Sequence, residues 1–255
     1  MVSMGLQLLV TALLLSFGVL SIVIAGRASF QKPFHKVFWT LAGSAFITHG
    51  TLQATQNLWG SLAMAAGGSS ATMATYLRWV PAFNHSRTFL WLAFSGVAVW
   101  LARRGSLPGS RAWGATAAAL AGGVLVGALL GYHEGAILAR THYTRVALLD
   151  ALELVVLLVV LFVALVSGRV DRHLWGALAV FATMVALNIV WYAAMSMIDD
   201  KRVWTPAPWM MNAYRVVPTS LMVAIAVRRL QLARRGVKVP SLLDRGSSGA
   251  PLLAG

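Results

Sequence analysis

Seven long apolar stretches, separated by short connections, constrain this 255-residue chain more than any other feature of its sequence. They cover about 4–26, 37–66, 87–102, 112–138, 144–167, 174–197 and 207–229. Most of them reach the ~20 residues that a helix needs to cross a bilayer core. Within hydrocarbon a helix satisfies its own backbone hydrogen bonds. The pattern therefore predicts an all-α integral membrane protein, built as a seven-transmembrane-helix bundle.

The basic residues of the connections predict the orientation of this bundle. If the odd-numbered connections and the chain from the end of the last span onward are cytoplasmic, fourteen Lys and Arg lie on that side, Arg228 and Arg229 among them, and six lie on the other. The positive-inside rule then places the N-terminus outside and the C-terminus in the cytoplasm. We assign the net charge of +14 to this topology and to anionic lipid at the basic cytoplasmic face, and we expect no binding of nucleic acid.

Composition predicts one membrane domain and little else. Hydrophobic residues make up 58% of the chain and charged residues 11%, as expected when the spans and their connections use most of the length. Residues 1–235 are predicted to form the transmembrane domain, and 236–255 a flexible cytoplasmic tail. Residues 67–86 are predicted to be an external connection with a short interfacial helix. The expected location is a prokaryote-type cytoplasmic (inner) membrane.

Polar side chains at membrane depth are the strongest functional signal in the sequence. Charge is costly in hydrocarbon, so such residues usually face a bundle interior or a water-filled cavity. Offsets of three, four and seven place the candidates of one span on a single helical face. They are therefore predicted to form an outward-facing, net-acidic cavity. The candidate ligand-binding residues are His49, Gln53, Gln56, His133, Glu134, Asp150, Glu153, Trp191, Tyr192, Asn212 and Arg215.

Two interpretations of this set need no cofactor. In the first, the polar groups only bridge helices, with Arg215 paired to Glu153 or Asp150. In the second, the cavity binds a small molecule: the carboxylates hold an amine or a proton and Arg215 holds an anion, while Trp191 or Tyr192 packs against a flat apolar body.

A third interpretation is a membrane-embedded metal- or haem-dependent enzyme that acts on a lipid or quinone-like substrate. His49, His133, Glu134, Asp150 and Glu153 offer nitrogen and oxygen ligands for Zn or Fe, and His49 with His133 is the intramembrane pair for haem. Glu134 would then serve as the acid/base. The chain contains no HxxxH, HExxH or ExxH motif, so no single helix presents two ligands at metal-binding spacing.

In size, in its seven predicted spans and in their orientation, the chain resembles the microbial rhodopsins. That family holds retinal through a Lys of the last span, whereas the lysines here are Lys32, Lys36, Lys201 and Lys238, all outside the predicted spans. Covalent retinal is therefore not expected. The seven-span hydrolases related to alkaline ceramidases carry paired histidines in their last helix, and these have no counterpart in this chain.

The polar cavity without a strong metal motif favours binding over catalysis. We therefore expect a small-ligand-binding or sensing component, or an accessory subunit of a membrane complex. Because no effector domain is expected after the seventh span, a signal is expected to pass through a protein partner. The expected partners are such a protein or, in a homo-oligomer, a second copy of the chain.

Overall fold

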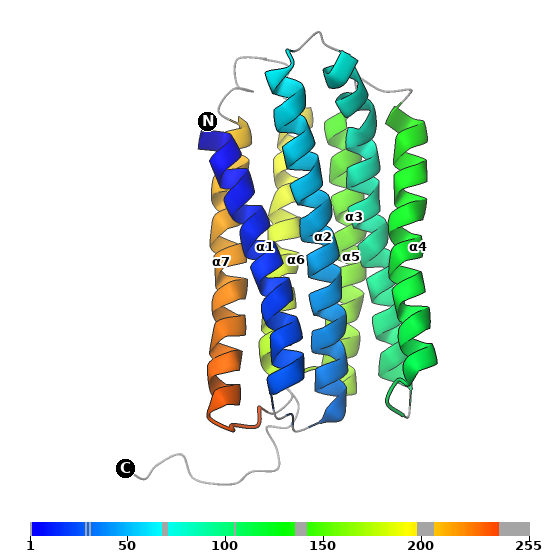
Figure 1. The fold of residues 1–255 in the computed structure, drawn as a ribbon, viewed down its shortest axis with the longest axis vertical. Helices are drawn as coiled ribbons and strands as arrows, with labels where there is room; N and C mark the ends of the chain where they lie inside the picture. The colour runs from blue at the N-terminus through cyan, green and yellow to red at the C-terminus, as the bar shows by residue number, and fades with distance from the viewer. Residues whose placement is uncertain are drawn as a thin grey trace.

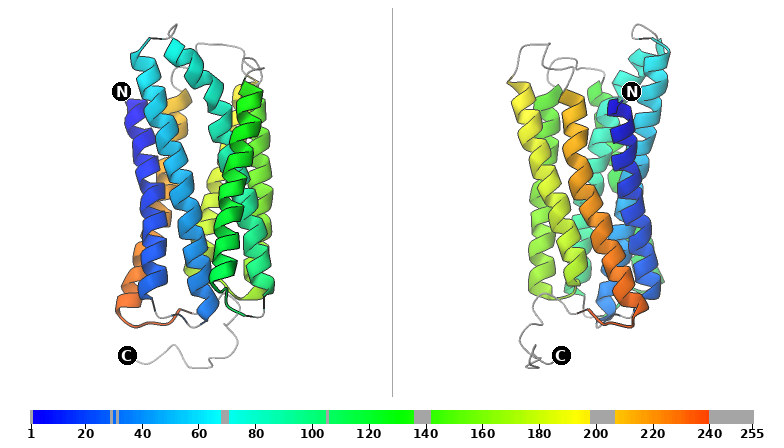
Figure 2. Two further views of the ribbon diagram at one scale, coloured as in Figure 1. Left: turned by 45° about the vertical axis from the view of Figure 1, so that its right-hand side comes forward. Right: turned by 90° about the vertical axis from the view of Figure 1, so that its left-hand side faces the viewer.

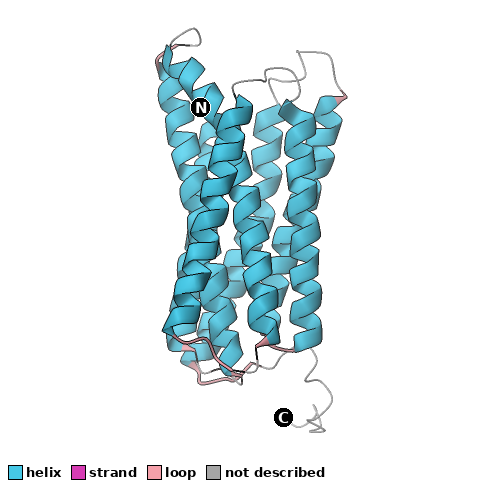
Figure 3. Cartoon of the chain, turned by 90° about the vertical axis from the view of Figure 1, so that its right-hand side faces the viewer, coloured by secondary structure: helices cyan, strands magenta, loops and turns pink. Residues whose placement is uncertain are grey.

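The computed structural model describes residues 2–28, 30, 32–67, 71–104, 106–135, 142–197 and 207–239. These residues form helices and contain no strand, as the all-α prediction requires (Figure 3). The helices are α1 (Val2–Arg27), α2 (Pro33–Ala65), α3 (Ala71–Arg103), α4 (Ser110–Gly135), α5 (His142–Ser167), α6 (Arg172–Ser196) and α7 (Ala207–Arg234).

Six of the helices form a closed ring, and α4 lies outside it. Going round the ring, α1 packs on α2, α2 on α3, α3 on α5, α5 on α6, α6 on α7, and α7 back on α1. All the helices run along one common axis (Figure 1). Two further views show the same bundle, with α4 standing beside α3 (Figure 2). The ring encloses a central space to which α4 contributes no wall.

Five of the described helices are long and apolar enough to cross a membrane, which indicates a multi-pass membrane protein. These segments are Met4–Arg27, Ser110–Glu134, Thr144–Ser167, Arg172–Ser196 and Met210–Arg234. Large apolar side chains such as Leu148 and Phe162 are each 65% exposed, as expected of residues that face lipid. Helices α2 and α3 are less apolar because they carry a large share of the polar side chains that face the ring interior.

Close packing of α4 on α3 depends on three glycines spaced four residues apart. A Cβ atom built on Gly123, Gly127 or Gly131 would lie 2.6, 2.5 or 2.4 Å from a backbone carbonyl oxygen of α3. Real Cβ atoms do not approach oxygen so closely, so these positions bring the two helix backbones together. Small residues serve this purpose in membrane helix pairs, where no hydrophobic driving force separates protein from lipid.

Helix α3 begins much earlier than the sequence predicted. Residues from Ala71 onward, predicted to be part of an external connection, are helical and continue without a break through Pro81 to Arg103. Arg87, predicted to mark the outer end of a span, therefore lies near the middle of a 33-residue helix. The hydropathy pattern hid this helix because its first half carries many polar residues, some exposed, such as Thr72 and Arg78, and others facing the ring interior, such as Asn84 and Arg87.

A buried ionic cluster joins α2, α6 and α7 at the end of the bundle opposite the N-terminus. Asp171 caps α6: its Oδ1 accepts hydrogen bonds of 3.0 Å from the backbone N–H groups of His173 and Leu174. Its Oδ2 accepts from Trp39 Nε1 at 2.6 Å and from Arg229 Nε at 3.0 Å. Asp171 and Arg229 are both 0% exposed. The sequence assigned Arg229 to the basic face that meets anionic lipid. That prediction is wrong, because the side chain is buried in the core.

The predicted tail starts at 236, and from 240 onward it lies outside the described residues.

An aromatic layer fills the centre of the ring. Phe46 contacts the rings of Trp91 and Phe181 edge-on, at centroid distances of 5.0 and 4.9 Å. All three side chains are 0% exposed. The layer closes the central space on the side away from the N-terminus. On its other side, toward the end of the bundle where α1 begins, the first polar residue is His49, which contacts the layer.

Candidate functional site

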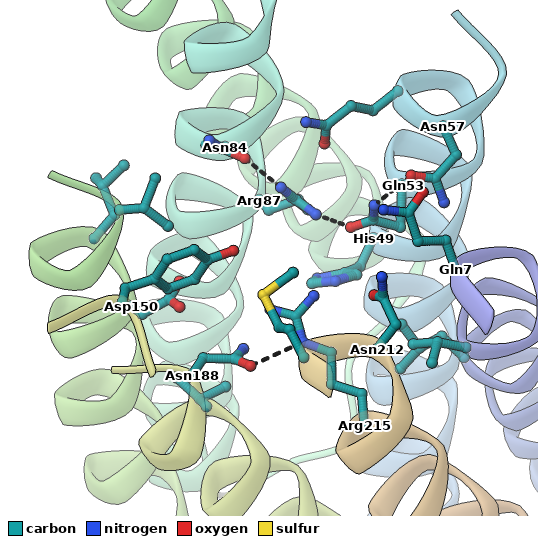
Figure 4. A pocket seen from close by; sticks show the side chains of 18 of the residues that line it. Gln7, His49, Gln53, Asn57, Asn84, Arg87, Asp150, Asn188, Asn212 and Arg215 are labelled. Carbon is teal, nitrogen blue, oxygen red and sulfur yellow. Dashed lines mark hydrogen bonds between the residues drawn. The ribbon is translucent and has the colours of Figure 1, made fainter. Parts of the chain in front are cut away.

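A polar cavity of about 270 Å³ lies inside the ring, between the aromatic layer and the end of the bundle where α1 begins. All six ring helices contribute to its lining, and its polar side chains point toward one another (Figure 4). The polar residues labelled there are Gln7 of α1, His49, Gln53 and Asn57 of α2, Asn84 and Arg87 of α3, Asp150 of α5, Asn188 of α6, and Asn212 and Arg215 of α7.

The α2 wall is a stripe of polar side chains four residues apart, as the spacing predicted. Gln53 Nε2 donates to Asn57 Oδ1 at 3.0 Å, and Asn57 Nδ2 donates to Thr11 Oγ1 of α1 at 3.1 Å. His49 lies one turn deeper, next to the aromatic layer. These bonds fix the amides in defined orientations, so the wall is organised before any ligand arrives.

His49 presents a hydrogen-bond donor to the cavity. Trp91 Nε1 donates to His49 Nδ1 at 3.0 Å, and an indole nitrogen can only donate. Nδ1 must therefore be the unprotonated nitrogen, which leaves the proton on Nε2 of a neutral ring. The side chain is 8% exposed, and the Trp91 bond fixes both its orientation and its tautomer.

Arg87 is the most important cavity residue that the sequence did not predict. Its terminal nitrogens donate to Gln53 Oε1 and to Asn84 Oδ1, both of them neutral amide oxygens. A guanidinium at this depth went unnoticed because the span was expected to begin at Arg87 itself. The signal that could have found it is the Asn84–Arg87 spacing of three residues, which continues the helical pattern upstream of the apolar run.

Arg215 enters the cavity from α7 on the opposite side. Its Nε donates to Asn188 Oδ1 of α6 at 2.8 Å, and the hydroxyl of Tyr214 donates to the same oxygen. Asn188 and Asn212 are 7% and 2% exposed. Like Arg87, Arg215 is oriented by a neutral amide.

Asp150 and Glu153 line the α5 side of the cavity one helical turn apart. Among the described residues, neither carboxylate makes an ion pair within 4.0 Å of Arg87 or Arg215. The predicted pairing of Arg215 with one of them is therefore not formed. The buried Oδ2 of Asp150 also has no hydrogen-bond partner among the described residues.

The remaining predicted residues divide between this cavity and other places. Within the lining lie His49, Gln53, Gln56, Asp150, Glu153, Tyr192, Asn212 and Arg215. Trp191 lies outside it, with its ring 6.3 Å from that of Tyr214. His133 is exposed on α4. Glu134 forms ion pairs with His85, at 2.9 Å, and with Arg145, in a separate small pocket.

The described part of the chain contains no group of three His, Asp or Glu side chains placed to hold a metal ion. His49 and His133, the predicted haem pair, do not meet, because α4 contributes nothing to the cavity. The Trp91 bond also leaves the proton of His49 on the nitrogen that faces the cavity, where a metal would need a lone pair. The geometry therefore gives the metal interpretation no support.

The cavity carries charges of both signs. Arg87 and Arg215 stand against Asp150 and Glu153, so the formal charges balance when both carboxyls are ionised, and the lining differs from the predicted net-acidic one.

Comparison with protein-family models, with curated proteins and with solved structures finds no match for this chain. Its functional assignment therefore rests on the chemistry of the cavity.

Proposed function

We propose that this chain is a seven-span protein of a prokaryote-type cytoplasmic membrane that binds a small polar ligand in its central cavity. Its N-terminus lies outside and its C-terminus in the cytoplasm, so the cavity opens to the external side. It acts as a sensing component or as an accessory subunit of a membrane complex. The observation that carries the proposal is the ring of six helices that directs charged and amide side chains into one cavity.

The lengths and positions of α2 and α3 support seven spans rather than five. Each has 33 residues, or about 50 Å at 1.5 Å per residue, which exceeds the ~30 Å of a hydrocarbon core. Both stand in the ring among apolar helices of similar direction. Their amide and guanidinium side chains line the cavity. Exposed threonines of the two helices, such as Thr55 and Thr75, donate their hydroxyls to backbone carbonyls of their own helix, which lowers the cost of facing lipid.

The separation of the charges favours ligand binding over simple bridging of helices. A bridging role would bring each guanidinium onto a carboxylate, because an unpaired charge at membrane depth is costly. Here both guanidiniums are held by neutral amides instead. A ring of oriented, partly unpaired groups around an open cavity is the arrangement expected of a preorganised binding site.

The proposal is tested by ligand-dependent stabilisation of the purified full-length protein in mild detergent. Fractions of a small-molecule cell extract are added, the midpoint of thermal unfolding (Tm) is measured, and the bound molecule is identified by mass spectrometry. A ligand that binds only the folded state raises its stability. Arg215→Gln and Asp150→Asn should each abolish the rise, whereas Arg145→Gln, outside the cavity, should preserve it. If no fraction shifts the Tm, or the cavity variants respond like the wild type, the proposal fails.

The orientation can be tested separately because the chain contains no cysteine. Thr72 at the start of α3 and Ser106, just beyond its end at Arg103, are both exposed. In intact cells a membrane-impermeant maleimide should label Thr72→Cys, whereas Ser106→Cys should react only after lysis. The reverse pattern would overturn the proposed orientation, and equal labelling of both positions in intact cells would overturn the span of α3.

A further inference from the structure

The cavity has a wall of hydrogen-bond donors on its α2, α3 and α7 sides. Arg87 and Arg215 reach toward His49 from α3 and α7 (Figure 4), and His49 adds the N–H group fixed by Trp91. Guanidinium groups match carboxylates in geometry and charge. Amide oxygens already hold each of these arginines in place, so a carboxylate would meet donors that need little reorganisation.

The α5 side of the same cavity is a wall of acceptors. Asp150 and Glu153 are its charged groups. Glu153 is 5% exposed, and Asp150 has a buried oxygen without a hydrogen-bond partner among the described residues. A carboxylate in such surroundings lacks the donors that water would supply, and an ammonium group offers three of them.

Charges of opposite sign thus face one small cavity without touching. A ligand with a single charge would satisfy one wall and leave the other unpaired inside the protein, which is costly. A ligand with both charges satisfies the two walls together. Apolar side chains also line the space and can receive an apolar substituent: Val10, Leu14, Phe181, Met184 and Val185.

We infer that the ligand of this cavity is a small zwitterion with a primary ammonium group and a carboxylate, of the amino-acid type. Its carboxylate lies between Arg87, Arg215 and the N–H of His49, and its ammonium group lies on Asp150 and Glu153. This inference rests on the proposed function and adds the chemical class of the ligand.

The experiment compares ligands that differ by one charged group. The full-length protein in mild detergent is heated with each of the twenty common amino acids. The amino acid that raises the Tm most is then compared with the same molecule lacking its carboxylate and with the same molecule lacking its amine. For leucine these analogues are 3-methylbutylamine and 4-methylpentanoate. At a concentration of 100 times Kd, a cognate zwitterion should raise the Tm by about 5–10 °C. The corresponding amine and acid should raise it far less at equal concentration.

Variants assign each end of the ligand to one wall. Asp150→Asn should weaken binding of the zwitterion and leave the response to the acid analogue unchanged. Arg215→Gln should also weaken binding of the zwitterion, but it should leave the response to the amine analogue unchanged. Arg145→Gln is the matched control, because Arg145 pairs with Glu134 in a separate pocket outside the cavity. Because the ligand comparison is made on the wild-type protein, the test stands even where a variant fails to fold.

The outcomes separate this inference from the proposed function. If an acid or an amine stabilises the protein as well as the zwitterion does, or if an extract fraction stabilises it while no amino acid does, the zwitterion inference is overturned and the binding function stands. If neither extract nor amino acids shift the Tm, both fall. A shift confined to a zwitterion and lost in both cavity variants supports both.

Discussion

The buried cluster around Asp171 predicts a large loss of stability from one substitution. Asp171→Ala removes the acceptor of four hydrogen bonds: two from the start of α6, one from Trp39 and one from Arg229. Among the described residues, the terminal nitrogens of Arg229 have no hydrogen-bond partner. Asp171 is therefore the one described hydrogen-bonding partner of a cation that is 0% exposed.

The size of the effect follows from these contacts. Loss of the helix cap costs about 1 kcal/mol, an unsatisfied buried Trp39 N–H about 1–3 kcal/mol, and a buried Arg229 without its carboxylate about 3–5 kcal/mol. Relaxation around one site makes these contributions overlap, so we expect a loss of about 4–6 kcal/mol in the free energy of unfolding. That is a large part of the 5–15 kcal/mol that typically stabilises a folded protein. The value is the cost of removing Asp171 while Arg229 stays buried, which is larger than the net contribution of the Asp171–Arg229 pair.

The assay is reversible unfolding in mixed detergent micelles, followed by tryptophan fluorescence. Asp171→Asn, Arg229→Met and the double variant complete a double-mutant cycle, in which the double variant should be less destabilised than the sum of the single ones. Glu134→Gln is the control, because its ion pairs are partly exposed and worth less than about 1 kcal/mol. The reasoning is refuted if Asp171→Ala costs no more than Glu134→Gln.

Two further predictions concern packing and the tautomer of His49. Gly123→Ala should destabilise the protein by about 1–3 kcal/mol through overpacking against α3. Gly122→Ala is the control and should be neutral or slightly stabilising, because nothing lies within 4 Å of a Cβ atom built there. Equal effects of the two variants in thermal unfolding would contradict the close contact of α4 with α3. Trp91→Phe should cost about 1–3 kcal/mol by leaving His49 Nδ1 without its donor, and ¹⁵N NMR of the wild type should place the proton on Nε2.

The sequence predicted the helical class and much of the cavity because both depend on local periodicity. His49, Gln53 and Gln56 share a face of one helix whatever their neighbours are. Asp150 and Glu153 do so for the same reason. Depth along a helix also follows from residue counting, so polar groups of separate helices were expected at one level.

The remaining features depend on which helices are neighbours, and periodicity does not carry that information. Glu134 has a suitable depth, but α4 stands outside the ring and its carboxylate pairs with His85 and Arg145. Arg87 was missed because hydropathy assigns a charged residue to the surface even when it faces a protein interior. Arg229 was assigned to the lipid surface for the same reason, although its partner Asp171 is distant in sequence.

The contact of α7 with α1 has a consequence for how the protein is made. Helix α7 is synthesised after the other six described helices, yet it closes the ring beside the first helix and supplies Arg215 to the cavity. Until it arrives, the charges of Arg87, Asp150 and Glu153 face an incomplete enclosure. A chain without α7 therefore leaves these charges open on one side, and the arrival of α7 both closes the ring and encloses them.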